Sequence, residues 1–486
     1  MTASPIWRTR LFAVGAGAVA IWLSVELAHG EYRWPAFAGA LLCLFLLTRL
    51  QPHSLSTLAL TAGAVGYIVG SRGFAQLSLS SQLPLLPAEL ILLLGGSLIL
   101  VHAAWRHELP LRREPVNLLL LGWMVYGTCR VVFDVRTFGI LALRDFALVY
   151  YAAFFFLGQE LAREMRATRL FENALLASCL VLMPLVILFD RFPDFFFGTL
   201  VVRGNPLIFY KGDLAGTFMA VGSVLFFNRF EERRRPWLLI ASLALAGGVV
   251  LSNNRASMLG LAIATAWLAV VGRWRFAIVQ SVTGGIAALV IVGAAAVLQI
   301  PWEKTPVYSL YERVASIADV SGQRTYRSED SSNKGDNNLY RTIWWRSVID
   351  ETLEGGPWLG LGFGRDLADR FVREYYPENS DEFNVRSPHN VLLSIFARMG
   401  AVGLLLFLAL LGAIAVRSWR SLREHPANAG LWCALWAILT SACFGVVLEG
   451  PMGAMIFWTV LGVACGREIH SDQETTPPSR PHATAP

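Results

Sequence analysis

Apolar runs of about 20 residues recur along this chain from residue 11 to residue 466, and they constrain its fold more than any other feature. A run of about 20 mostly apolar residues is long enough to cross the hydrocarbon core of a bilayer as an α-helix. Only 16% of the residues are charged and 55% are hydrophobic, whereas a soluble globular chain carries about 25% charged residues. This composition excludes a disordered protein and argues against a large soluble enzyme. The sequence therefore predicts an all-α protein, a polytopic bundle of about 12–14 transmembrane helices.

The runs and the segments between them divide the chain into four parts. Residues 1–299 hold the first spans, 300–387 form one large loop, 388–466 hold the last spans, and 467–486 form a polar, Pro-rich tail that we expect to be disordered. The first run has no clean small-x-small cleavage site, so we expect it to remain as a span. The runs lie at 11–29, 34–50, 55–71, 85–105, 115–133, 141–161, 170–190, 213–230, 236–252, 256–272, 276–299, 400–417, 428–447 and 451–466.

Basic residues are distributed unequally between alternate loops. Of the 41 Lys and Arg, twenty fall at the termini and in loops on one side, and nine fall in the short segments on the other side. Because cytoplasmic loops carry an excess of Lys and Arg, both termini are expected in the cytoplasm and the large loop outside. The net charge of +6 is explained by this orientation in a lipid bilayer, and no nucleic-acid partner is expected.

The side chains that commonly bind metals show no ligand pattern. All six cysteines fall inside apolar runs and none forms a Cys-x-x-Cys motif, so we expect buried small side chains rather than disulfides or zinc ligands. The acids of the large loop are expected on its solvated surface, and the chain has no Asp-x-Asp motif. The sequence therefore predicts neither a metal nor a cofactor.

Within the large loop, residues 338–353 have the apolar periodicity of an amphipathic helix. The adjacent Trp344 and Trp345 indicate that this helix lies at the outer interface of the membrane. The Gly-rich run 354–364 must turn sharply. It lacks the spacing and the strand context of a dinucleotide-binding loop, and we expect it to place the end of a helix.

His389 stands where the large loop re-enters the membrane, in the sequence SPHNVLLSIF. Pro388 can begin a helix, which would put His389 in the first turn. A helix N-terminus disfavours an imidazolium, so a neutral His389 could accept a proton there. A structural role in capping the re-entry helix fits the same pattern, and the residues alone leave both roles open.

Four cations lie near the outer ends of spans. Arg255 stands in a very short loop, and an arginine at membrane depth costs roughly 2.5–3.5 kcal/mol on insertion scales, so it normally has an anionic partner. Arg191, Arg203 and Lys211 are interleaved with aromatic residues between 191 and 212. Such a group could hold a lipid-linked phosphate. A snorkelling arginine and an aromatic belt are the structural alternatives.

Four segments of the C-terminal half resemble the bacterial O-antigen ligase and O-antigen polymerase superfamily. The most specific is SPHNVLLSIFARMGAVG, in which His389 is followed by Gly400 and Gly403. The N-terminal half is similar only in being polytopic. The other resembling segments, in family order, are 251–264, 338–364 and 448–464.

The resemblance implies an integral-membrane glycosyltransferase of surface polysaccharide assembly, for lipopolysaccharide or exopolysaccharide. The donor would be an undecaprenyl-diphosphate-linked glycan, the acceptor a glycan or a lipid-linked sugar, and the site would face the periplasm from the bacterial inner membrane. On this analogy His389 is the general base, Arg255 and Arg203 hold the diphosphate, and Arg341 of the amphipathic helix is a further candidate. Guanidiniums would stabilise the leaving diphosphate without a metal, and back-side attack would invert the anomeric centre.

The acceptor stays open, because ligases, polymerases and protein O-oligosaccharyltransferases share these motifs. The polar large loop favours a polymerase of a surface polysaccharide. The competing class is a flippase or transporter of the same lipid-linked sugar, which also needs many spans and a basic cavity. Such a protein needs no positioned base at its outer face, so the His389 motif favours an enzyme.

Overall fold

The computed structural model divides the chain into two units, Met1–Leu58 and Ala59–Pro486, and the described residues belong to the second unit except for 52–58. The spans predicted at 11–29 and 34–50 lie outside the described residues. The structure describes residues 52–77, 85–106, 112–202, 204–210, 212–252, 254–319, 324, 326–327, 329–375 and 386–475.

Helices make up almost all of the described chain. Two short strands, β1 (Val201–Val202) and β2 (Asn205–Pro206), pair antiparallel. The helices are α3 (Pro52–Val69), α4 (Arg72–Ala75), α5 (Pro87–Arg106), α6 (Pro115–Phe138), α7 (Ile140–Asp145), α8 (Ala147–Tyr150), η1 (Tyr151–Ala153), α9 (Phe154–Leu161), α10 (Met165–Arg191), α11 (Pro193–Gly198), α12 (Gly212–Arg233), α13 (Pro236–Leu251), α14 (Arg255–Val270), α15 (Arg275–Val297), η2 (Trp302–Lys304), α16 (Pro306–Ala318), α17 (Glu329–Gly355), α18 (Asp369–Tyr375), α19 (Val391–Glu424), η4 (Pro426–Asn428), α20 (Ala429–Ala442) and α21 (Pro451–Thr475).

Within the described residues, six helical segments are long and apolar enough to cross a membrane, by length and composition. Shorter apolar helices of 10–17 residues accompany them, including α13 and α14. The predicted all-α helical bundle is therefore confirmed. The six segments are Pro87–Trp105, Pro115–Phe138, Ile140–Leu161, Met165–Arg191, Arg275–Val297 and Val391–Glu424.

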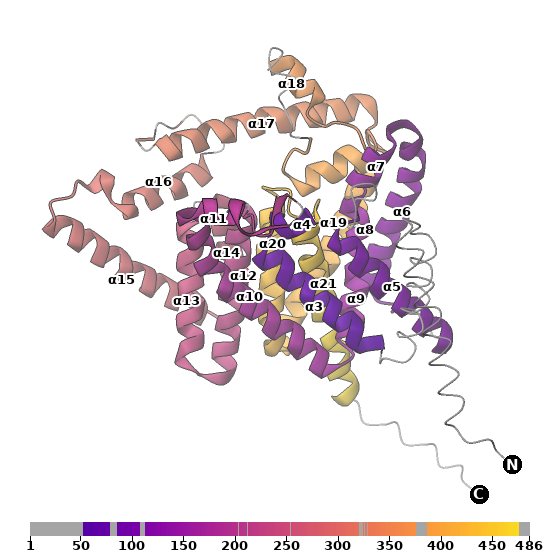
Figure 1. Cartoon of the computed structure of the whole chain (residues 1–486), viewed down its shortest axis with the longest axis horizontal. Coiled ribbons are helices and arrows are strands. Elements are labelled where there is room, and N and C mark those ends of the chain that lie inside the picture. The colour runs from indigo at the N-terminus through magenta and orange to yellow at the C-terminus, as the bar shows by residue number, and fades with distance from the viewer. Residues whose placement is uncertain are drawn as a thin grey trace, which may run out of the picture. The chain divides into compact units, whose positions relative to one another are not determined.

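α12 is surrounded by other helices. Every residue from Leu214 to Asn228 is buried, because α12 packs against α10, α13, α14 and α20. A helix that is apolar around its circumference needs such surroundings. α15 is the opposite case, since it diverges from the bundle (Figure 1) and exposes large apolar side chains such as Leu289 and Val297. Exposed apolar surface of this kind is typical of a helix that faces lipid.

α16, α17 and α18 lie across one end of the bundle (Figure 1). They belong to the predicted large loop, and α17 begins at Glu329, earlier than the start at 338 that the sequence predicts. Trp344 of α17 is 1% exposed and stacks on Phe371 of α18. Both rings belong to a small core that includes Ala397 of α19. The apolar face of α17 therefore attaches this layer to the bundle.

α19 is kinked at Gly400, which has a φ of 65°. The Gly-rich run after α17 packs into the kink, where Leu361 N donates to Ala397 O at 2.6 Å. A Cβ at Gly400 would lie 2.3 Å from backbone atoms of Trp358, so both the close approach and the positive φ require glycine. The predicted turn is therefore held in place by α19, because its backbone bonds to α19 where that helix is interrupted.

α21 continues to Thr475, beyond the span end at 466 that the sequence predicts. Arg467 pairs with Glu172 of α10, which holds the extended end of the helix against the bundle. The disorder expected for the whole 467–486 tail is therefore corrected, since its first part is helical. Residues 476–486 lie outside the described residues.

Candidate active site

His389 lies between the large loop and α19, and its φ is 56°. α19 begins at Val391, and the side chain of Asn390 caps it by accepting two backbone N–H groups of the first turn at 3.1 and 3.2 Å. The prediction that Pro388 begins the helix and that His389 lies in its first turn is therefore wrong. Asparagine is among the strongest N-caps, so the helix starts after it and His389 stays outside.

Neighbouring groups hold the left-handed backbone of His389 in place. Its N–H donates to Ser387 Oγ at 3.4 Å, and its ring centroid lies 6.1 Å from that of Trp344. Trp345 Nε1 donates to Pro388 O at 2.7 Å. A non-glycine residue in this region costs of order 1–3 kcal/mol and persists only where its surroundings impose it. The two adjacent tryptophans of α17 therefore fix the segment that carries His389.

Glu449, in the connection between α20 and α21, is a residue that the sequence analysis missed. Its Oε1 accepts from Ser387 Oγ at 2.8 Å and from Ser394 Oγ at 2.7 Å. Burial raises the pKa of Glu449, although both serine hydrogen bonds oppose the shift. One carboxylate thus ties this connection to the chain on both sides of His389. The sequence could have indicated Glu449 by one feature, because it is the acidic residue in segment 448–464, which resembles the O-antigen ligase and polymerase superfamily.

Arg341 of α17 reaches the same connection. Its Nη1 donates to Phe444 O at 2.9 Å. Burial lowers the pKa of Arg341, and the nearby carboxylate of Asp213 opposes this shift. An arginine still stays protonated, because its ordinary pKa exceeds 12. Since Phe444 and Glu449 belong to one short connection, Arg341 and the segment of His389 are held against the same stretch of chain.

Arg255 is the first residue of α14, and Asn254 caps this helix. Arg255 Nη1 donates to Ser316 O at 3.2 Å and to Ser316 Oγ at 3.3 Å. Asn338 of α17 also donates to Ser316 O, at 2.9 Å. Asn338 precedes Arg341 by about one helical turn, so the two share a face of α17. The end of α16 therefore links Arg255 to the face of α17 that carries Arg341.

Of the other three predicted cations, the structure describes only Arg191. Arg203 and Lys211 lie outside the described residues. Arg191 is the exposed last residue of α10. The first half of α10 contacts the last turns of α12 through the Glu172–Arg229 ion pair, so the two helices run antiparallel. Arg191 therefore lies at the end of the bundle where α12 begins, on its exposed rim.

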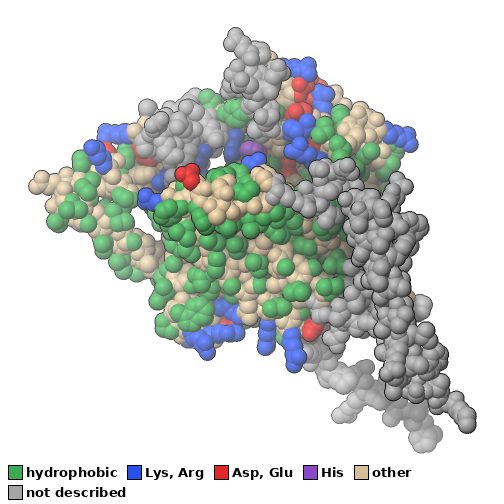
Figure 2. Space-filling view, in the orientation of Figure 1, with side chains coloured by type: hydrophobic (Ala, Val, Ile, Leu, Met, Phe, Trp, Pro, Cys, Tyr) green, Lys and Arg blue, Asp and Glu red, His purple; other side chains and the backbone are tan. Residues whose placement is uncertain are grey.

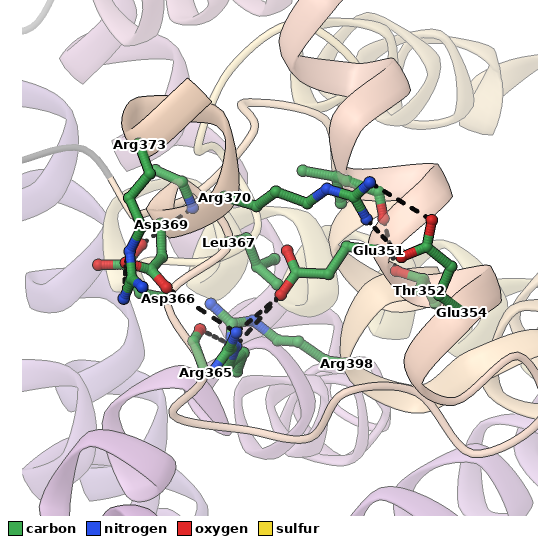
Figure 3. Close-up of polar contacts among 12 residues, drawn as sticks. Glu351, Thr352, Glu354, Arg365, Asp366, Leu367, Asp369, Arg370, Arg373 and Arg398 are labelled. Carbon is green, nitrogen blue, oxygen red and sulfur yellow. Dashed lines mark hydrogen bonds and ion pairs between the residues drawn. The ribbon is translucent and has the colours of Figure 1, made fainter. Parts of the chain in front are cut away.

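Two ion pairs, of which Arg398–Asp145 is buried, and a hydrogen bond from Gly364 connect the large-loop helices to the bundle. Arg398 of α19 has a side chain only 3% exposed and pairs with Asp145 at 2.7 Å, and Gly364 N donates to the same carboxylate at 3.0 Å. Beside Arg398, Arg365 pairs with Glu351 of α17 at 2.9 Å (Figure 3). These contacts fix the position of α17, and with it the position of Arg341.

The residues that these contacts connect lie in a region that matches a known protein family. Residues 240–408 match the family model described as O-antigen ligase. The match includes Arg255, Arg341 and His389, and it confirms the resemblance to the O-antigen ligase and polymerase superfamily. It supports an O-antigen ligase- or polymerase-type role in surface polysaccharide assembly, in a multi-pass membrane protein. No curated protein matches the chain.

Proposed function

We propose that this protein transfers or polymerises an undecaprenyl-diphosphate-linked oligosaccharide onto an acceptor sugar at the periplasmic face of the bacterial inner membrane. One observation carries the proposal: Arg255, Arg341 and His389 lie far apart in the sequence, yet their segments are held together. Hydrogen bonds attach Arg255 to α16, α16 to α17, Arg341 of α17 to the α20–α21 connection, and Pro388, the neighbour of His389, to α17. A base together with fixed cations suits the displacement of a diphosphate leaving group by a sugar hydroxyl.

The arginines are proposed to bind the diphosphate. As the bond between the anomeric carbon and the diphosphate breaks, the electron pair moves to the leaving oxygen. Guanidiniums of Arg255 and Arg341, already oriented by Ser316 and the Phe444 carbonyl, stabilise this charge without reorganising. Arg191 is proposed to guide the anionic donor from the rim, and Arg203 and Lys211 are further proposed ligands of its diphosphate.

His389 is proposed to accept the proton of the acceptor hydroxyl while that oxygen attacks the anomeric carbon. Attack opposite the leaving diphosphate inverts the anomeric centre. An imidazole has an ordinary pKa of about 6.5, which suits this proton transfer near neutral pH. Glu449 acts as a positioning residue, because it binds Ser387, which in turn accepts the N–H of His389.

The reaction is proposed to need no divalent cation. Within the part of the chain that the structure describes, no group of three or more His, Cys, Asp or Glu side chains could hold one, and the arginines supply positive charge instead. Glycan product formed at full rate in excess EDTA is the expected result. Loss of product in EDTA that a divalent cation restores would contradict metal independence.

Reconstitution of the purified full chain with undecaprenyl-diphosphate-linked repeat units tests the activity. Arg341→Ala is expected to lower the rate of glycan transfer or polymerisation at least 100-fold, in the range of a lost electrostatic contact in a transition state. Arg346→Ala is the matched control, because Arg346 lies on the same helix with a side chain 86% exposed. Equal rates for both variants would remove Arg341 from the site.

The same assay separates the enzyme from a flippase. An enzyme lengthens or transfers the glycan and releases undecaprenyl diphosphate. A flippase moves labelled lipid-linked sugar across the vesicle bilayer and leaves the glycan unchanged. Movement without any glycan product from wild-type protein would overturn the proposed reaction.

A further inference from the structure

A cavity of about 300 Å³ lies between α10, α12, α20 and α21, at the end of the bundle opposite His389. Its position follows from the direction of the helices, since α21 begins beside Glu449 and reaches the cavity at Arg467. Likewise, the first turn of α12 contains Asp213, which lies near Arg341, and the last turns of α12 line the cavity. The lining residues with charged or amide side chains are Arg169, Glu172, Asn228, Arg229, Glu232, Arg233 and Arg467.

The cavity and the candidate active site are separated by the length of α12. This helix has 22 residues, which correspond to about 33 Å at 1.5 Å per residue. The hydrocarbon core of a bilayer is about 30 Å thick. Figure 2 shows apolar side chains covering the bundle between its two ends and basic side chains gathered along its lower rim. If the candidate active site lies at one interface of a membrane, the cavity therefore lies at the other.

Two arginines inside the cavity are held in fixed positions. Glu172 pairs with Arg229 at 2.7 Å and with Arg467 through its other oxygen. The side chains of these three residues are 11–22% exposed. Fixed guanidiniums lose little further conformational freedom when they bind an anion. Because one carboxylate is shared by two guanidiniums, it orients both of them at the wall of the cavity and leaves a net positive charge there.

The cavity also carries an excess of positive charge. It is lined by four arginines and two glutamates, and Arg169 and Arg233 are exposed at its mouth. Arginine recognises phosphate by paired N–H···O bonds. Apolar side chains of Met165, Leu176 and Leu225 complete the wall. The lining therefore combines a phosphate-binding part with a surface on which a hydrocarbon chain can lie.

We propose that this cavity binds the headgroup of an anionic phospholipid from the leaflet opposite the candidate active site. The phosphodiester would contact Arg169 and Arg233 at the mouth and the oriented pair Arg229 and Arg467 within. Basic pockets between transmembrane helices on the cytoplasmic side are suited to such headgroups. The ligand is distinct from the lipid-linked glycan, because the two sites lie at opposite ends of the bundle.

Native mass spectrometry of the detergent-solubilised full chain tests the proposal, with dioleoylphosphatidylglycerol and dioleoylphosphatidylcholine titrated in parallel. We expect phosphatidylglycerol to bind more tightly. The double variant Arg169→Gln/Arg233→Gln is expected to weaken the first binding event of phosphatidylglycerol about thirtyfold, because each basic residue near an anionic headgroup contributes about fivefold. Arg235→Gln is the matched control, since Arg235 follows the same helix but does not line the cavity.

Three outcomes would overturn the proposal. Equal affinity for the two lipids would exclude recognition of the anionic headgroup. Unchanged affinity in the double variant, or the same loss in Arg235→Gln, would place lipid binding elsewhere on the basic rim. Competition by millimolar inorganic phosphate as complete as that by phosphatidylglycerol would show a free-anion site instead. Because the readout is lipid binding, failure of the proposed transferase activity would leave this result unaffected.

Discussion

Glu449 offers the most informative perturbation, because it is the buried group that connects the α20–α21 segment to His389. Glu449→Ala removes the acceptor of two serine hydroxyls, of which Ser394 is fully buried and Ser387 is 9% exposed. A buried hydroxyl without a partner costs about 1–3 kcal/mol. Water can reach part of the vacated space, so each hydroxyl should cost an amount near the lower end of that range. We therefore expect the free energy of unfolding to fall by about 2–3 kcal/mol for the two serines together.

The effect on catalysis should exceed the effect on folding. Without Glu449, Ser387 no longer has a fixed orientation in which to accept the N–H of His389, whose left-handed backbone then loses one support. A displacement of about 1 Å at a reacting group can cost on the order of 100-fold in rate. We therefore expect turnover per folded molecule of Glu449→Ala to fall about 100-fold in the proteoliposome assay, with a smaller loss for Glu449→Gln, which keeps an acceptor oxygen.

The pH dependence of stability provides an independent check. Burial raises the pKa of Glu449 above its ordinary value of 4.5, so the folded protein binds this proton more tightly than the unfolded chain. The stabilisation is fully present below pH 4.5 and is lost as the pH rises through the folded-state pKa. The melting temperature of wild type relative to Glu449→Gln should therefore fall as the pH rises from 4.5 towards neutrality. The positioning role has its own test. If folded Glu449→Ala turned over substrate at the same rate as wild type, that role would be refuted.

Three further predictions concern the site and its orientation. His389→Ala should lower turnover by about 10²–10⁴-fold, and the wild-type rate should rise with pH around the imidazole pKa of about 6.5; normal turnover of folded His389→Ala would return this residue to a structural role. Arg255→Ala should abolish most transfer while Arg255→Lys keeps a part of it, because a point charge replaces a planar fork; wild-type rates in both would exclude diphosphate binding there. A cysteine at exposed Arg346 should react with an impermeant maleimide added from the periplasmic side, whereas one at exposed Arg420 should not; the reverse pattern would invert the topology.

Hydropathy predicts the bundle well because the bilayer imposes one requirement on every span. Backbone polar groups in hydrocarbon must be satisfied within the segment, so an apolar run of sufficient length becomes a helix. The runs at 236–252, 256–272 and 276–299 correspond to α13, α14 and α15 with ends shifted by only a few residues. Helix ends depend on local side-chain bonds instead, and the cap at Asn390 shows how one such bond moves His389 out of the helix.

Contacts between distant segments could not be predicted in the same way. Glu449 and Ser387 are separated by 62 residues, and Asp145 lies still farther along the chain from its partner Arg398. Neither pair has a spacing rule, because each contact depends on how whole helices pack. The sequence marked His389 and Arg255 by their positions at the ends of spans and Arg341 through the resemblance to a family, but it offered no means to find the buried carboxylates that hold the surrounding segments.

The partners of two buried arginines separate a structural role from a binding role. Arg398 pairs with Asp145 at 2.7 Å, which cancels its charge, and removing either partner would leave an uncompensated buried charge. Arg341 instead donates to a neutral carbonyl of Phe444, which orients the guanidinium without cancelling its charge, although Asp213 contributes an opposing charge nearby. A guanidinium held in this way can still attract an anion. The geometry therefore favours Arg398 as a support of the fold and Arg341 as a ligand of the diphosphate.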